Sequence, residues 1–169
     1  MRTLRLLLFL ASIVIVQVTV FPHLRWLGVV PDLGLLVAVA VGYREGPEAG
    51  ALVGFIAGLC YDLFLETPLG FSALAYALVG YGVGTLQAGM LRSPRWLPPF
   101  LGAAGGFVGG LVLLTIGTLV GVDAVKGTHG FVTISLAALY DMLLAPFVFF
   151  LVSKVLPERR PTGITWTVR

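Results

Sequence analysis

Six long apolar stretches run along the chain, and short joints rich in polar residues, proline and glycine separate them. The stretches cover about residues 4–21, 29–43, 47–65, 69–91, 97–122 and 131–155. All but the second reach about the 18–20 residues of a membrane-crossing helix, and the second offers about 15. Because joints this short connect neighbouring antiparallel helices, the pattern predicts an all-α integral membrane protein. We expect six transmembrane helices in one compact bundle over residues 1–156, followed by a tail at 157–169.

The composition supports the membrane assignment. The mean hydropathy is +1.00 and 11% of the residues are charged, against about 25% in soluble domains. Six crossings use nearly all of the 169 residues, so no separate soluble domain is expected. Cys60 is the only cysteine and lies in an apolar run, which predicts a small apolar side chain with neither a disulfide nor a metal.

The positive charges predict the orientation. With a cytoplasmic N-terminus, the inner segments hold Arg2, Arg5, Arg44, Arg92, Arg95, Lys154, Arg159, Arg160 and Arg169, and the outer joints hold Arg25 and Lys126. Cytoplasmic loops carry an excess of Lys and Arg, so both termini should be cytoplasmic in a bacterial inner membrane. The first stretch lacks a small-x-small cleavage site and is expected to stay as a helix.

Small residues recur at a spacing of four in the middle stretches. The third stretch carries Gly50, Gly54 and Gly58, and the fifth carries Gly102, Gly106 and Gly110. In lipid, helices associate where small residues let their backbones approach. Two interpretations stay open for these faces: tight packing inside the bundle, and docking of a partner's transmembrane helix.

Two acids lie within the predicted spans, where an ionised carboxylate is costly unless it is paired, neutral or hydrated. Asp62 continues the Gly50, Gly54, Gly58 row near the outer end of its span. It is either a capped, partly solvated helix end or a proton or solute site. Asp141 lies near the middle of the last span and is a proton or ion site, a polar contact between helices, or a contact to another subunit. If protonated, it would donate a hydrogen bond to a neighbouring span.

Other polar residues have simpler interpretations. Asp32 follows Pro31 and is predicted to cap the second helix without a functional role. Gln17 should find a partner inside the bundle, and Pro146 should kink the last helix. The histidines, His23 and His129, lie in outer joints. No catalytic motif, phosphate-binding loop or continuous basic face occurs, so the sequence argues against an enzyme, a cofactor and nucleic-acid binding.

Several segments resemble the rod shape-determining protein MreD family. They are Pro31-Asp32-Leu33, Gly46-Pro47, the run from Gly50 to Leu59, Asp62, Pro68-Leu69-Gly70, Gly80-Tyr81, and Leu139-Tyr140-Asp141 followed by Pro146. Their order and spacing carry the resemblance, which runs from about residue 31 to 84 and resumes in the last stretch. Leu65-Glu66 departs from the family pattern, and the tail after Pro157 has no counterpart.

The resemblance implies a non-enzymatic membrane scaffold of the complex that makes side-wall peptidoglycan and sets cell shape. The partners it implies are MreC, through a transmembrane helix, MreB directly or through MreC, RodA with its penicillin-binding protein, and membrane lipid. It also implies a fold similar to the substrate-binding subunits of energy-coupling-factor vitamin transporters. A small-solute or vitamin transporter subunit is therefore the alternative function.

Overall fold

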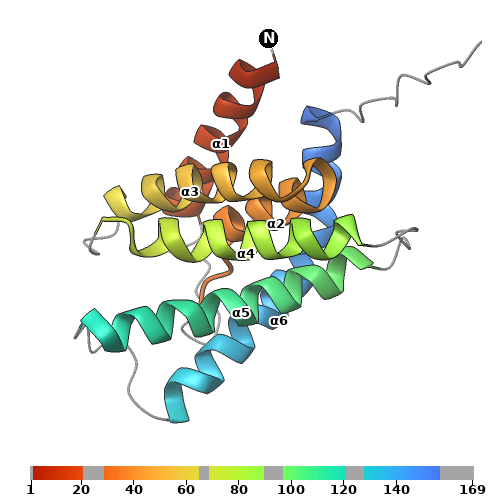
Figure 1. Ribbon diagram of the computed structural model, residues 1–169. Coiled ribbons are helices and arrows are strands. Elements are labelled where there is room, and N and C mark those ends of the chain that lie inside the picture. Colours follow the sequence, from red (N-terminus) through yellow and green to blue (C-terminus); the bar gives the residue numbers. More distant parts are fainter. Residues whose placement is uncertain (1, 21–28, 65–68, 90–96, 121–127, 157–169) are drawn as a thin grey trace, which may run out of the picture.

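The computed structural model describes residues 2–20, 29–64, 69–89, 97–120 and 128–156, and the regular secondary structure in them is helical (Figure 1). The helices are α1 (Arg2–Thr19), α2 (Leu33–Glu45), α3 (Pro47–Phe64), α4 (Phe71–Ala88), α5 (Leu97–Val120) and α6 (Thr128–Val155). Each predicted apolar stretch therefore contains one helix, in the predicted order.

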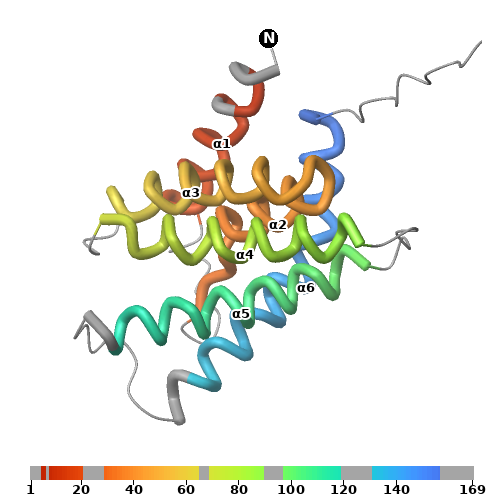
Figure 2. Tube along the Cα trace, in the orientation of Figure 1, coloured from red at the N-terminus to blue at the C-terminus, as the bar shows by residue number. Residues whose placement is uncertain are grey.

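The short helix α2 is the centre of the bundle and contacts all five other helices. Its residues from Leu33 to Gly42 are all buried. In Figure 2, α3 and α4 lie side by side in front of α2, α5 and the first part of α6 lie below α4, and the last part of α6 rises beside α2 on the right. A helix that is covered on every side must be apolar on every side. That requirement explains why α2 is a continuous apolar run rather than an amphipathic one.

α2 and α3 are joined by the single residue Gly46. Its φ of 98° and ψ of 177° lie in a region that is essentially restricted to glycine. Pro47 then begins α3, in the first helical position that suits its fixed φ and missing N–H. The Gly46-Pro47 pair thus turns the chain within one residue and sets α3 directly against α2.

Two helix boundaries differ from the sequence-based expectation. α2 begins at Leu33 rather than near residue 29, because Asp32 has non-helical dihedrals and its side chain caps the helix by accepting from Leu35 N–H. α6 begins at Thr128 rather than 131, so His129 belongs to a helix and not to a joint. The cap predicted at Asp32 is confirmed, but it leaves α2 with 13 residues.

Within the part of the chain that the structure describes, three helices are long and apolar enough by themselves to cross a membrane: Pro47–Phe64, Leu97–Thr118 and Phe131–Val155. α2, with 13 residues, extends only about 20 Å and falls short of that standard. The chain thus has the helices of a membrane protein, and the full six-span topology stays a prediction.

Some predicted features lie outside the described residues. They are His23, Arg25, Arg92, Arg95, Lys126, the turn at Leu65-Glu66 and the tail at 157–169. The structure describes Cys60 as a half-buried free thiol on α3. Pro146 lies inside α6, which continues through it to Val155.

Candidate functional site

A group of polar side chains surrounds the start of α2, deep inside the bundle. It consists of Gln17 from α1, Asp32 from the α2 cap, Tyr76 from α4 and Asp141 from α6, which we call the central polar cluster. Gln17, Tyr76 and Asp141 are each less than 5% exposed. Because Asp141 is halfway along α6, the cluster lies at the depth of the middle of that helix rather than at either end of the bundle.

Gln17 holds the backbone just before α2. Its Nε2 donates to Pro31 O over 2.8 Å, and its Oε1 accepts from Leu33 N–H over 2.9 Å. Both backbone groups precede the first helical hydrogen bonds and would otherwise be unpaired. One amide side chain of α1 therefore satisfies a backbone acceptor and a backbone donor at the start of α2.

Asp141 of α6 binds the start of α2 as well. Its Oδ1 accepts from Asp32 N–H over 2.9 Å. The other oxygen, Oδ2, lies against Gly106 of α5, where any side chain would collide with it. The sequence suggested Asp141 as a donor, but in this hydrogen bond the carboxyl oxygen accepts. This geometry is that of a polar contact between helices.

Asp32 and Tyr76 complete the cluster. The Tyr76 hydroxyl donates to Asp32 Oδ2, while Asp32 Oδ1 caps α2 by accepting from Leu35 N–H over 3.1 Å. Sequence reasoning missed Tyr76 and gave Asp32 only a capping role. A signal for Tyr76 existed: a tyrosine among the small residues of α4 must bury its ring and still find a partner for its hydroxyl.

The central polar cluster joins helices that are distant in sequence. Hydrogen bonds run to the start of α2 from α1, α4 and α6. An unsatisfied backbone group in a membrane interior costs several kcal/mol, so these side chains allow a helix to begin at mid-depth. Among the described residues, no group of three or more His, Cys, Asp and Glu side chains could hold a metal ion.

Asp62 has a different partner set. Its oxygens accept from the backbone N–H groups of Gly70, Ser72 and Ala73, at 2.9 to 3.4 Å. These groups belong to the start of α4, where the first N–H groups have no partner within the helix. Asp62 is buried rather than solvated, and it caps the neighbouring helix α4 instead of the end of its own.

The glycine row of α3 packs against α4. A methyl group added at Gly58 would lie 2.5 Å from Ala73 Cα, and one at Gly50 would lie 2.5 Å from Gly80 O. At Gly54 the added carbon would collide with the backbone of Tyr76 and Ala77. Such distances are far inside van der Waals contact, so α4 occupies the face that α3 offers, joined at Gly50 by Gly42 of α2.

The glycine row of α5 packs against α6. The added carbon would meet Ala145 and Asp141 at Gly102, Asp141 and Ala138 at Gly106, and Ile134 at Gly110. The structure therefore places neighbouring helices of the same chain on both predicted faces. A partner's helix would have to dock on another surface.

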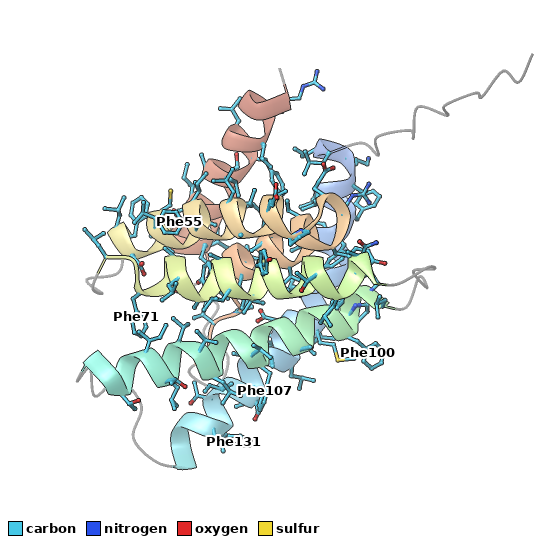
Figure 3. All side chains as sticks on the ribbon, in the orientation of Figure 1. Phe55, Phe71, Phe100, Phe107 and Phe131 are labelled. Carbon is cyan, nitrogen blue, oxygen red and sulfur yellow. The ribbon has the colours of Figure 1, made fainter. Side chains whose placement is uncertain are left out.

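Much of the outer surface of the described helices is apolar. Figure 3 shows Phe55 on α3 and Phe100 on α5 pointing outward, and both are about half exposed. Further exposed apolar side chains include Leu8, Ile15, Leu52, Leu78, Val108, Leu139, Leu143 and Phe147. Such a surface suits contact with lipid tails and with other transmembrane helices.

The comparison with protein families identifies the chain. A family model described as rod shape-determining protein MreD matches residues 1–155, which include all six helices. No curated protein and no solved structure gives a significant match. With the match extending over nearly the whole sequence, the chain belongs to the MreD family of rod shape-determining membrane proteins.

Proposed function

We propose that this protein is a non-enzymatic scaffold subunit of the bacterial elongation (rod) complex. In this role it crosses the inner membrane six times with both termini in the cytoplasm and supports side-wall peptidoglycan synthesis and cell shape. The observation that carries the proposal is the family match over residues 1–155. MreC is the direct partner, through its transmembrane helix. MreB, directly or through MreC, and RodA with its penicillin-binding protein complete the assembly.

The structure supports a scaffold because its internal faces are already filled and only its outer surface is free to contact a partner. The glycine faces of α3 and α5 are occupied within the chain, and the central polar cluster is hydrogen-bonded within the chain. What remains for a partner is the apolar outer surface. Membrane helices associate there by dispersion contacts and small-residue packing rather than by a hydrophobic driving force.

Site-specific crosslinking tests the proposal. Photo-crosslinking residues are placed at exposed positions on different helices, Leu8, Leu52, Leu78, Val108 and Phe147, in cells that express tagged MreC. We expect MreC adducts from the positions of one face and none from the others. The fully buried Ala38 is the matched control. Failure of every exposed position to give an adduct, together with no copurification of MreC, would contradict the proposal.

One observation favours the alternative, a small-solute or vitamin transporter subunit. α2 begins at mid-depth beside polar side chains, and transporters often bind substrates where the end of a helix meets polar groups inside the bundle. The fold similarity to energy-coupling-factor subunits belongs to this alternative as a prediction. Substrate-dependent uptake by the purified protein in vesicles, lost in Asp141→Asn, would favour transport over the scaffold.

A further inference from the structure

α6 packs against two different parts of the bundle with its two halves. In the first half, Ile134, Ala138 and Asp141 face the glycine row of α5. Phe131 also packs edge-on against Phe107 of α5, with ring centroids 5.8 Å apart (Figure 3). The first half of α6 and α5 therefore form one closely packed pair.

The second half of α6 packs against α2. Val148, Phe149 and Val152 are buried in the core, and the Phe149 ring lies 5.6 Å from that of Tyr43 near the end of α2. Just after α6, Leu156 O accepts from Arg44 Nη2 over 3.3 Å. This half is thus held to the same unit as α2, whereas the first half is held to α5.

Pro146 lies between the two halves. Proline has no N–H, so the carbonyl of Met142, four residues earlier, lacks its helical partner, and the proline ring crowds that carbonyl. Sharp bends in helices occur at such positions. The weakest point of the α6 backbone therefore coincides with the point where its packing partner changes.

The contact at the boundary between α5 and α2 is made by side chains, whereas the contact between α3 and α4 is made by backbone atoms. An added carbon at Gly105 or Gly109 would meet only side-chain atoms, with Val39 Cγ2 at 2.7 Å and Leu35 Cδ2 at 2.6 Å. At Gly50 and Gly58 of α3 it would instead meet backbone atoms of neighbouring helices. Side-chain tips can rotate as two helices shift, whereas backbone contacts fix them, so α5 can move more easily against α2 than α4 can against α3.

A hydrogen bond crosses this boundary. Asp141, on the α5 side of Pro146, accepts from Asp32 N–H at the start of α2. We propose that Pro146 is a hinge about which α5 and the first half of α6 move as one body relative to α1–α4, and that the Asp32–Asp141 hydrogen bond holds the closed state. This motion is internal to the chain and does not depend on which partner the protein binds.

Distances between spin labels, measured by pulsed electron–electron double resonance in lipid nanodiscs, test the hinge. Spin labels are attached to cysteines at the exposed positions Leu52 of α3 and Leu139 of α6, which lie on opposite sides of the boundary, in a Cys60→Ala background. A control pair at Leu52 and Leu78 lies within the α3–α4 unit. The full-length chain is used throughout.

Asp141→Leu removes the acceptor, and we expect the cross-boundary distances to lengthen or broaden while the control pair stays unchanged. Asp141→Asn keeps an accepting oxygen and should match the parent protein. Pro146→Ala restores a helical hydrogen bond and should narrow the cross-boundary distribution, which provides a test even if Asp141→Leu does not fold. Unchanged cross-boundary distances in both Asp141→Leu and Pro146→Ala, or equal changes in the control pair, would overturn the proposal.

Discussion

Asp141 accepts a hydrogen bond from Asp32 N–H over 2.9 Å, although 109 positions separate the two residues in the sequence. The bond places the middle of α6 directly beside the first turn of α2. Together with Gln17 and Tyr76, it allows the central helix to start at mid-depth with its backbone groups paired.

Gln17 should contribute to stability through both ends of its amide. Gln17→Leu leaves Pro31 O and Leu33 N–H without a partner, at about 1–3 kcal/mol for each buried group. Gln17→Glu keeps an acceptor for Leu33 N–H but places an oxygen against Pro31 O. The melting temperature in detergent should therefore be higher for the parent protein than for either variant. A melting temperature unchanged in Gln17→Leu would show that α1 does not stabilise the start of α2.

Asp62 should stabilise the bundle by capping α4. Asp62→Leu removes the acceptor for three N–H groups and should cost more than the roughly 1 kcal/mol of an exposed cap, because the site is buried. Asp62→Asn keeps one accepting oxygen and should lie between the parent and the leucine variant. Chemical denaturation measures this order. Equal stability of the asparagine and leucine variants would contradict the capping role.

Gly54 and Gly82 provide a matched pair of glycines on packed and open helix faces. Gly54→Ala places a carbon against the α4 backbone, whereas Gly82 has nothing within 4 Å. We expect the first change to cost about 1–3 kcal/mol or more by overpacking. Gly82→Ala should be neutral or should stabilise by up to about 1 kcal/mol through helix propensity. Fluorescence-detected size-exclusion chromatography measures the fraction of each variant that stays monodisperse after heating. This fraction should be lower for Gly54→Ala than for Gly82→Ala. Equal behaviour would mean that α3 and α4 are farther apart than the structure shows.

Gly46 should be required for its backbone conformation and not for space. An added carbon meets nothing within 4 Å, but φ is +98°, so Gly46→Ala should cost about 1–3 kcal/mol of backbone strain. Denaturation of Gly46→Ala beside the Gly82→Ala control separates strain from any general effect of alanine. A stability loss no larger than that of the control would indicate that the α2–α3 turn can relax.

The sequence predicted the helices well because all the apolar runs but the second are long, and each ends beside proline, glycine or a charged residue. α3 was expected at 47–65 and occurs at Pro47–Phe64. Hydropathy alone placed the start of α2 near residue 29, whereas the cap predicted at Asp32 gave the correct start at Leu33, because hydropathy does not register backbone dihedrals. Pro31 and Asp32 lie in an apolar context, yet the Asp32 side chain caps the helix and delays it to Leu33.

The candidate site was predictable in part. Asp62, Asp141 and Gln17 stand out in sequence because a polar side chain within an apolar span needs a partner. Their partners were not predictable, since Asp141 contacts Asp32 and Asp62 contacts the start of α4. Tyr76 gave a weaker signal than these residues, because tyrosine in a membrane helix is common at interfaces as well as in cores.

The sequence by itself determined where the helices lie, that they belong in a membrane, and which side of α3 and α5 allows close approach. Only the tertiary structure decided that α4 and α6 fill those sides and that α2 is central. The physical reason is that a glycine row exposes backbone to any helix of suitable shape. The choice among helices depends on the whole set of contacts and on hydrogen bonds between residues far apart in the chain.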